Sequence, residues 1–163
     1  MRNNGKGIKG IKMKKKAYIF DIDNTLADCE HRLIYIDGSL GPKDWDVFYS
    51  LCHKDKPIED VCDLYRQLYS LDAEMLIVTG RPDKILQNTV SWLHNNDIYF
   101  SPWNLFMRKD GDHRPDYEVK REIYEREIKD KYQILGVFED RQQCVDMWRS
   151  LGLTCFQVAK GNY

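Results

Sequence analysis

The segment Ala17-Tyr-Ile-Phe-Asp-Ile-Asp-Asn-Thr-Leu-Ala27 places two carboxylates, those of Asp21 and Asp23, directly behind a short apolar run. Alternate residues of an extended chain point the same way, so both carboxylates can face one small volume, where their repulsion calls for a cation. Asn24 tolerates a positive φ better than most residues, which favours a tight turn here. An isolated Asp-x-Asp more often caps a loop, so the pair needs support from elsewhere in the chain.

The rest of the chain alternates between short apolar segments and helical patterns. The segments with strand character are residues 17–22, 75–79, 103–107, 134–138 and 154–158. Apolar side chains recur at helical spacing between them: Val61, Leu64, Tyr65, Leu68 and Tyr69; Ile85, Leu86, Thr89, Val90 and Leu93; Val119, Ile123 and Tyr124; Cys144, Val145, Trp148 and Leu151. This alternation predicts an α/β fold with a doubly wound, Rossmann-like, mostly parallel sheet.

Polar side chains follow three of the predicted strands. They are Asp21 and Asp23 after the first strand, Thr79 and Arg81 after the second, and Glu139 and Asp140 after the fourth. Ligands of open α/β sheets bind beyond the carboxyl ends of the strands, where the chain order switches. We therefore expect the three groups to meet in one acidic pocket, where oxygen ligands from separate strands suit Mg²⁺.

The second strand, Leu76-Ile-Val-Thr-Gly-Arg-Pro82, ends in a hydroxyl and a glycine. Pro82 stands where we expect the first residue of a helix. Free backbone N–H groups at such a helix start, together with the Thr79 hydroxyl, can hold a phosphate oxygen. An ordinary Thr-Gly turn explains this segment equally well when it is considered alone.

Two further motifs have common structural explanations. Taken alone, Glu139 and Asp140 are more typical of a helix N-terminus, where acids are favoured by the helix dipole. Lys120 lies in a helical pattern, where most lysines are solvated. Both motifs gain weight only from their companions in the predicted pocket.

Composition and charge limit the class of protein. The chain has 163 residues, 42% of them hydrophobic and 31% charged, as expected for one globular domain. It contains no apolar run near the roughly 20 residues of a membrane span and no signal-peptide pattern, so we expect a cytoplasmic protein without a membrane partner. The five cysteines include no C-x-x-C pair, which indicates reduced, packed thiols.

The first 16 residues form a basic segment with seven Lys/Arg and no acid, while the whole chain has a net charge of only −1. We expect residues 1–16 to be a flexible leader and residues 17–163 to form the domain. The leader could contact nucleic-acid phosphates, although a solvated terminus is the more common explanation. Met13 is an alternative start of the native chain.

These residues together resemble the haloacid dehalogenase-like (HAD) phosphatases, and among them the 3′-phosphatase domain of phage-type polynucleotide kinase-phosphatase. The superfamily motifs are Asp21-Ile-Asp-Asn-Thr25, Thr79-Gly-Arg81, Lys120 and Glu139-Asp140. The subfamily features are Arg32, Arg108-x-x-Gly-Asp112, Asp116 four residues before Lys120, and the ending Met147-Trp-Arg…Gln157-Val-Ala-x-Gly-Asn-Tyr163. Two residues depart from the usual pattern, since Asn24 replaces a glycine and Glu139 replaces an aspartate.

The resemblance implies a role for each motif. Asp21 is expected to attack phosphorus and form an aspartyl-phosphate, and Asp23 to act as acid and base. Thr79 and Lys120 would neutralise charge on the transferring phosphoryl group, together with Mg²⁺. The expected metal ligands are Asp21, the main-chain carbonyl of Asp23 and Asp140. Glu139 is expected either to position Lys120 or a metal-bound water molecule, or to bind the metal directly. The expected substrate-binding residues are Thr25, Arg32, Gly80, Arg81, Arg108 and Asp116.

Residues 28–57 are expected to form a small helical cap inserted after the first strand of the HAD-type sheet. Trp45, Phe48 and Tyr49 fall at helical spacing in this segment, and Tyr35 precedes them. Aromatic rings at the mouth of a pocket can stack on a terminal base. Packing within the cap is the more common role of such a stripe, and we expect it at least for Phe48.

The leading hypothesis is a Mg²⁺-dependent phosphatase that removes the 3′-phosphate from DNA or RNA ends. One alternative is a phosphatase of nucleoside monophosphates or other small esters, and another is a module that binds nucleic-acid ends without hydrolysis. No G-x-x-x-x-G-K-[ST] loop occurs in the sequence, so we do not expect 5′-phosphorylation by this chain. A separate kinase or ligase is a possible partner, and the sequence does not indicate the oligomeric state.

Overall fold

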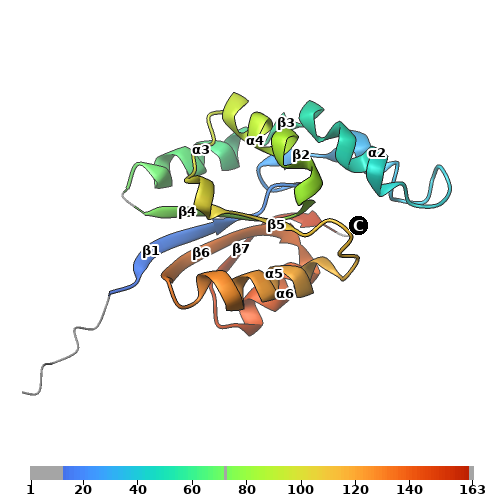
Figure 1. Ribbon diagram of the computed structural model, residues 1–163. Helices are drawn as coiled ribbons and strands as arrows, with labels where there is room; N and C mark the ends of the chain where they lie inside the picture. Colours follow the sequence, from blue (N-terminus) through green and yellow to red (C-terminus); the bar gives the residue numbers. More distant parts are fainter. Residues whose placement is uncertain (1–12, 72, 162–163) are drawn as a thin grey trace, which may run out of the picture.

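The computed structural model describes residues 13–71 and 73–161, which form one five-stranded parallel sheet with helices on both faces (Figure 1). The strands are β1 (Lys15–Phe20), β4 (Glu74–Pro82), β5 (Leu105–Arg108), β6 (Tyr132–Arg141) and β7 (Cys155–Gly161). Their order across the sheet is β5-β4-β1-β6-β7. The predicted doubly wound α/β fold is confirmed.

Helices cover the two faces of this sheet in pairs. Figure 1 shows α3 (Glu59–Tyr69) and α4 (Leu86–Asn95) above the sheet, with α5 (Asp116–Ile123) and α6 (Gln142–Ser150) below it. A π-helical turn, Tyr124–Ile128, continues α5. Short 3-10 turns cover Leu51–Lys54, Asp83–Ile85 and Pro102–Asn104.

The chain order of the sheet switches on the two sides of β1. From β1 the chain proceeds to β4 and β5 on one side and later to β6 and β7 on the other. All of these strands are parallel, so the loops that follow β1, β4 and β6 meet at one edge. This edge is where an open α/β sheet binds its ligands.

The core lies in two layers because neighbouring residues of β1 face opposite sides of the sheet. Phe20 packs above the sheet with Tyr65 of α3, whereas Ile19 packs below it with Trp148 of α6. Burying one such side chain stabilises the fold by about 1.5–3 kcal/mol. All five cysteines are buried and free, as expected from the sequence.

Three predicted boundaries need correction. β1 begins at Lys15, inside the expected leader, whose residues 1–12 lie outside the described part of the chain. Trp103 is not in a strand, because the 3-10 turn that starts at Pro102 delays β5 until Leu105, and its side chain is 86% exposed. β4 continues through Pro82, so no helix starts there; a 3-10 turn begins at Asp83 and α4 at Leu86.

The buried stripe of α3 differs in part from the predicted one. Leu64 and Tyr69 are exposed, while Cys62 and Tyr65 are fully buried. The Tyr65 hydroxyl donates to the carbonyl of Tyr99, 2.8 Å away, which fixes this side of the helix toward the core. Cys62 of the same helix also belongs to the buried core, so the apolar pattern alone placed the buried face of α3 about one residue away from its actual position.

The segment between β1 and α3 leaves the edge of the sheet and returns to the same place. It contains β2 (Ala27–Asp28), α1 (Glu30–Leu33), α2 (Trp45–Ser50) and β3 (Lys56–Pro57). β2 and β3 pair antiparallel at its base. The Asp44 carboxylate begins α2 by accepting from the amide of Val47 at 2.9 Å. Figure 1 shows α2 extending beyond the sheet on the same side as β2 and β3.

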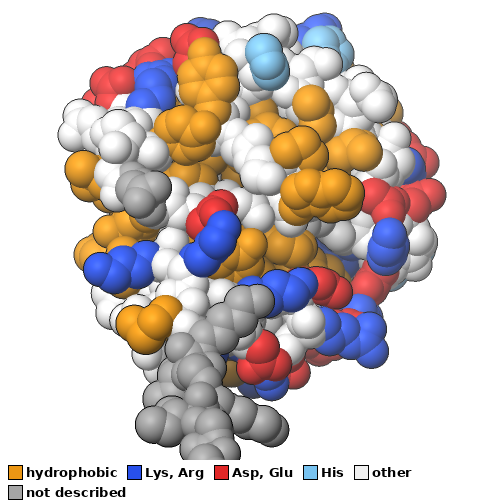
Figure 2. Space-filling model, turned by 60° about the vertical axis from the view of Figure 1, so that its left-hand side comes forward, with side chains coloured by type: hydrophobic (Ala, Val, Ile, Leu, Met, Phe, Trp, Pro, Cys, Tyr) orange, Lys and Arg blue, Asp and Glu red, His pale blue; other side chains and the backbone are white. Residues whose placement is uncertain are grey.

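The opposite edge of the sheet has a different surface. Leu71, which precedes β4, is 70% exposed, and Trp103 lies exposed before β5. Figure 2 shows hydrophobic side chains gathered on one face of the molecule, with charged side chains mostly toward its margins. Among the described residues, no helix is long and apolar enough to cross a membrane.

Candidate active site

A cavity of about 400 Å³ opens at the carboxyl edge of the sheet. Asp21, Asp23 and Asp140 contribute to its floor from the strand ends. Side chains of α2 line one wall, and the loop between β5 and α5 lines another. A volume of this size is typical of small-ligand pockets.

The turn after β1 positions the two carboxylates. The carbonyl of Ile22 accepts from the amides of Thr25, Leu26 and Ala27 at 3.1, 2.8 and 2.8 Å, which closes the turn. Asn24 has a φ of 57°, as its residue type allows, and its side-chain oxygen accepts from the amide of Cys29 at 3.2 Å. The turn therefore holds its shape with asparagine in place of the glycine that is usual in this motif.

Lys120 lies at the centre of a buried group of three carboxylates. Its Nζ is 3.0 Å from Asp21 Oδ1, 3.0 Å from Asp116 Oδ2 and 2.8 Å from Glu139 Oε2. Burial opposes a charge on this amine, but the acids around it raise the pKa of Lys120 above its usual range. These four residues are called the Lys120 cluster below, and its single cation is shared among three acids.

The pKa values of the three carboxylates in the Lys120 cluster shift in different directions. Burial raises the pKa of Asp21, Lys120 opposes this, and Glu139 and Asp116 add to the rise. Burial likewise raises the pKa of Glu139 to about 6, against the lowering effect of Lys120. The pKa of Asp116 is lowered, because Lys120 and two nearby arginines outweigh its burial. Asp21 and Glu139 therefore lack a full counter-charge.

Three buried acids offer a set of ligands for a divalent cation. One carboxylate oxygen each from Asp21, Glu139 and Asp140 lies within 4.8 Å of the others. This all-oxygen donor set fits Mg²⁺. Glu139 is already engaged, since Oε2 faces Lys120 and Oε1 accepts from the amides of Asp140 and Arg141 at 3.2 and 3.3 Å. The contacts of Glu139 favour a role in holding Lys120 and the backbone at the end of β6.

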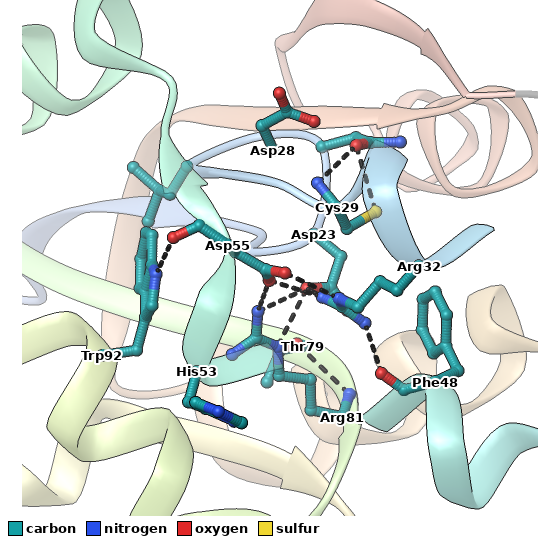
Figure 3. A network of polar contacts seen from close by, with 12 residues as sticks. Asp23, Asp28, Cys29, Arg32, Phe48, His53, Asp55, Thr79, Arg81 and Trp92 are labelled. Carbon is teal, nitrogen blue, oxygen red and sulfur yellow. Dashed lines mark hydrogen bonds and ion pairs between the residues drawn. The ribbon is translucent and has the colours of Figure 1, made fainter. Parts of the chain in front are cut away.

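Asp23 belongs to a second buried cluster, drawn in Figure 3. Its Oδ1 accepts from Nη2 of Arg32 at 2.6 Å and from Nη2 and Nε of Arg81 at 2.6 and 2.9 Å. Both guanidinium groups also bind the carboxylate of Asp55. Despite burial, the two arginines hold the pKa of Asp23 well below its usual range. These four residues are called the Asp23 cluster.

Thr79 and Gly80 end the regular part of β4 beside these clusters. The Thr79 hydroxyl is buried and accepts from the amide of Arg81 at 3.2 Å. A Cβ on Gly80 would overlap the carboxylate of Asp116, so only glycine allows this close approach. The predicted helix start at Pro82 is wrong, and the backbone next to Thr79 is extended instead of being the N-terminus of a helix.

Arg108 organises the wall opposite α2. Its Nε donates to the carbonyl of Gly80 at 3.0 Å, and Nη2 to Asp116 at 3.1 Å. Nη1 donates to the carbonyls of Asp112 and Arg114 at 3.0 and 2.7 Å. Arg108 therefore closes its own loop and ties it to β4 and α5, while it also lines the cavity.

The wall formed by α2 is aromatic. Phe48 is buried, as expected, and the guanidinium carbon of Arg32 lies 4.1 Å from its ring centroid. Trp45 is 40% exposed and stacks on Tyr49 with the ring centroids 5.8 Å apart. Tyr49 donates its hydroxyl proton to the carbonyl of Gly80 at 3.3 Å, which fixes the wall against β4.

The structure separates the predicted site residues into three groups. Those that line the cavity are Asp21, Asp23, Gly80, Arg108, Asp116 and Asp140. Those that lie buried directly behind it are Arg32, Thr79, Arg81, Lys120 and Glu139. Thr25 lies deeper; it is fully buried, and its hydroxyl has no hydrogen-bond partner among the described residues.

Sequence reasoning missed Asp55, which contacts both arginines of the Asp23 cluster. This acid stands in the polar stretch His53-Lys54-Asp55-Lys56-Pro57, which has no apolar period and no motif spacing. No sequence signal separated Asp55 from an ordinary loop acid. Its importance follows only from its partners, which lie 23 and 26 residues away along the chain.

Comparison with known proteins gives a consistent result for almost the whole described chain. A model of the family described as polynucleotide kinase PNKP phosphatase domain matches residues 15–163. A protein of Autographa californica nuclear polyhedrosis virus, described as a candidate bifunctional polynucleotide kinase/RNA ligase, is 30% identical over 149 residues. That match covers 89% of this chain and 20% of the viral protein, so the chain spans about a fifth of that relative.

Solved structures agree with this match. A chain in a structure of the Pnkp1/Rnl/Hen1 RNA repair complex is 29% identical, with a TM-score of 0.80, and the match covers 92% of this chain and 44% of that one. The class C acid phosphatase from Bacillus anthracis with tungstate bound has a TM-score of 0.68 at 16% identity, covering 93% and 69% of the two chains. At that identity it supports the fold alone. The resemblance inferred from the motifs is confirmed.

Proposed function

The chain belongs to the family of polynucleotide kinase PNKP phosphatase domains, which are HAD-type phosphomonoester hydrolases, and we propose that it removes the terminal 3′-phosphate from DNA or RNA ends. The observation that supports this proposal most strongly is the meeting of Asp21 and Asp140 at the floor of one cavity, with Lys120 buried behind them and 3.0 Å from Asp21. A nucleophile, a fixed cation and a candidate metal ligand thus lie within reach of a single phosphoryl group.

In the first step we propose that a carboxylate oxygen of Asp21 attacks phosphorus. The bond from phosphorus to the ester oxygen breaks, and an aspartyl-phosphate forms on Asp21. Asp23 gives a proton to the departing alkoxide, which becomes the free 3′-hydroxyl. Two arginines hold the pKa of Asp23 well below its usual range, so Asp23 must take up this proton from solvent before the step begins.

In the second step a water molecule attacks the same phosphorus atom. Asp23, now ionised, takes one proton from this water, and the bond from Asp21 to phosphorus breaks. Inorganic phosphate leaves, Asp21 is again a free carboxylate, and Asp23 again carries the proton that the first step uses. The two steps replace one difficult displacement by two easier ones.

The chain's cations neutralise the phosphoryl oxygens during both steps. Lys120 is charged and fixed by three carboxylates, so it supplies a preorganised positive charge. Arg108 lines the cavity and is the arginine best placed to reach substrate, with the Thr79 hydroxyl and Gly80 beside it. Arg32 and Arg81 would act mainly through Asp23, and Thr25 through support of the turn.

The acid set at the strand ends would hold Mg²⁺ through Asp21, Asp140 and the main-chain carbonyl of Asp23. When bound, the ion would keep Asp21 ionised and neutralise charge on the phosphoryl group. Glu139 would keep Lys120 in place and could also orient a ligand water.

Nucleic acid as the substrate is supported by the mouth of the cavity. Trp45 and Tyr49 offer a stacked aromatic surface for a terminal base. Basic side chains also line the cavity, and we propose that they contact backbone phosphates. They are Lys43 and, each paired with a neighbouring acid, Lys84, Lys109 and Arg114. We propose that residues 28–57 form the cap that carries this aromatic surface. We also propose that the basic residues of the expected leader 1–16 that precede β1 lead into the domain.

A comparison of three substrates tests the proposal. Phosphate release is measured with Mg²⁺ from a 3′-phosphorylated oligonucleotide, from its 5′-phosphorylated isomer and from a free 3′-nucleotide, in DNA and RNA forms. We expect the 3′-phosphorylated oligonucleotide to react fastest. Equal rates on all three substrates would contradict the nucleic-acid-end proposal while leaving the phosphatase assignment in place.

A second candidate substrate class is small phosphomonoesters such as nucleoside monophosphates. The cavity volume of about 400 Å³ favours it, because a mononucleotide would fill such a space without further contacts. A higher rate on free nucleotides than on oligonucleotides would support this class. The non-catalytic binding module is set aside, because the chain belongs to a phosphatase family.

Partners and compartment are also proposals. The similar proteins are described as a polynucleotide kinase/RNA ligase and as part of an RNA repair complex. A kinase and a ligase that act on the same nucleic-acid ends are therefore the partners we propose for this phosphatase. We propose that it works in the cytoplasm.

A further inference from the structure

Asp55 is a buried carboxylate that the proposed chemistry does not use. It lies between the 3-10 turn Leu51–Lys54 and β3, where the chain returns from the segment that carries α2. Its side chain is 0% exposed. Figure 3 shows it pointing toward the guanidinium groups on the side away from Trp92. A buried acid needs several donors, so its partners define what it does.

The partners of Asp55 are the two arginines that hold Asp23. Arg32 binds it through Nε at 2.8 Å and Nη2 at 2.6 Å, and Arg81 through Nη2 at 2.8 Å. His31 Nε2 lies 2.9 Å from the same carboxylate. The contact with Arg32 uses two nitrogens and both carboxylate oxygens, a fork that fixes orientation as well as distance.

The backbone of Asp55 is fixed from a different direction. Trp92 of α4 donates its indole N–H to the carbonyl of Asp55 at 2.8 Å. The following residues pair with β2 at the base of the inserted segment. Asp55 is therefore held by the core on one side and holds the arginines on the other.

Charge balance gives Asp55 a further role. Two buried arginines facing Asp23 alone would leave one positive charge uncompensated, and Asp55 makes the Asp23 cluster neutral. Neither Asp55 nor the two arginines lines the cavity, whereas Asp23 does. These three residues therefore reach the acid–base chemistry through Asp23, while Arg32 also contacts the cavity wall at Phe48.

We propose that Asp55 is a positioning residue: it fixes Arg32 and Arg81 so that the carboxyl group of Asp23 faces the leaving-group oxygen in the cavity. This inference rests on the proposed function, in which Asp23 transfers the proton. It assigns to the base of the inserted segment a part in proton transfer, in addition to covering the site.

The dependence on the leaving group distinguishes positioning from a merely structural role. An alkoxide leaving group needs a proton from Asp23, whereas an aryl oxide such as p-nitrophenolate leaves without one. We expect Asp55→Asn to lower kcat/KM on a 3′-phosphorylated oligonucleotide by about 100-fold and on p-nitrophenyl phosphate by less than about 5-fold. The ratio kcat/KM reports the steps through formation of the aspartyl-phosphate and excludes the second step, in which Asp23 acts on both substrates alike. KM for the oligonucleotide should stay close to the wild-type value.

Asp63→Asn is the matched control. Asp63 is an exposed aspartate of α3 that also pairs with an arginine, Arg66, at 2.5 Å, but it lies away from the cavity. It should leave both rates within about twofold of the wild type. An equal loss on both substrates in Asp55→Asn, or no loss on either, would overturn the positioning role.

His31→Gln provides a second variant if Asp55→Asn does not fold. The half-exposed His31 contacts only one oxygen of Asp55, so its replacement leaves both arginines in place. We expect a smaller loss with the same bias, about fivefold on the alkyl ester and none on the aryl ester. No difference between the two esters would contradict the proposal.

Failure of the proposed function would look different. If the wild type does not hydrolyse the 3′-phosphorylated oligonucleotide but hydrolyses another alkyl phosphate, the substrate proposal fails. The comparison of alkyl and aryl esters then remains valid with that alkyl phosphate, so the role of Asp55 is tested independently.

Discussion

Asp21 and Asp23 lie two residues apart at the end of one strand, yet their surroundings are electrostatically opposite. Asp21 shares a single buried cation, Lys120, with two other carboxylates. Asp23 faces two buried arginines, Arg32 and Arg81. The other carboxylate that binds both of them is that of Asp55. Both acids are buried, but the pKa of Asp21 is raised and that of Asp23 is lowered.

This comparison shows that the number of cations near each buried carboxylate decides whether the pKa of that carboxylate rises or falls. With all groups ionised, the Lys120 cluster carries three negative charges and one positive charge, whereas the Asp23 cluster is neutral. A negative pocket attracts a divalent cation, and a neutral, closely bonded cluster fixes one side chain in place. The two carboxylates can therefore take different roles in one reaction.

The largest expected effect comes from removing the nucleophile in the Lys120 cluster. Asp21→Asn keeps the shape of the side chain but cannot form an aspartyl-phosphate, so kcat should fall by about 10⁴-fold or more. The far-UV circular dichroism spectrum should stay unchanged. If the variant released phosphate at a rate near that of the wild type, Asp21 would not be the nucleophile, and the different roles assigned to Asp21 and Asp23 would be wrong.

The next effect concerns stability. Lys120→Met removes the cation that three buried carboxylates share and leaves Asp116 with Arg108 and Arg141 as its cationic neighbours. The free energy of unfolding at pH 7 should fall by about 3–5 kcal/mol. Lys131→Met, which removes an exposed lysine paired with Glu127, is the control and should cost less than about 1 kcal/mol. Urea unfolding of both variants measures the difference, and equal losses would contradict the central place given to Lys120.

Metal binding sharpens the comparison further. Mg²⁺ at about 100 times its Kd should stabilise the wild type by about 2.7 kcal/mol, because the ion binds only the folded chain. Asp140→Asn should lose most of this stabilisation, whereas Asp146→Asn on the exposed side of α6 should keep it. Thermal unfolding with Mg²⁺ and with EDTA gives the measurement. The same shift in Asp140→Asn as in the wild type would show that the acid set is not the metal site.

The smallest expected effect is a pH dependence. The pKa of Glu139 is raised by burial from 4.5 to about 6, so the folded metal-free protein binds more protons than the unfolded chain between these values. The free energy of unfolding should therefore fall by about 2 kcal/mol as the pH rises from about 4.5 to 6. Glu139→Gln should lack this component. Unfolding in EDTA at both ends of the range tests it, and identical pH profiles for the two proteins would contradict the assignment.

The sequence was sufficient for the architecture and for the Lys120 cluster. Apolar runs and helical periods predicted all five strands of the main sheet, because burial on both faces requires such runs. The acids after the first and fourth strands, together with Lys120, followed from strand ends that must share one edge and from the family resemblance. In a parallel sheet, residues that follow different strands in the sequence become neighbours at one edge of the sheet.

The Asp23 cluster was less accessible to sequence reasoning. Asp55 is fixed by tertiary contacts with distant arginines, and such contacts leave no local pattern. Sequence reasoning also missed the extension of β4 through Pro82, because a proline two residues after a glycine suits a helix start as well as the end of a strand. Both errors concern the same region, where the inserted segment meets the sheet and local propensity is overruled by packing.

The stereochemistry at phosphorus tests the central claim most directly. A 3′-phosphorothioate oligonucleotide made chiral at phosphorus with ¹⁶O and ¹⁸O is hydrolysed in H₂¹⁷O, and the configuration of the released inorganic [¹⁶O,¹⁷O,¹⁸O]thiophosphate is determined. Two in-line displacements, first by Asp21 and then by water, predict overall retention. Overall inversion would show that water attacks the substrate directly, and it would contradict the account of Asp21 as the nucleophile.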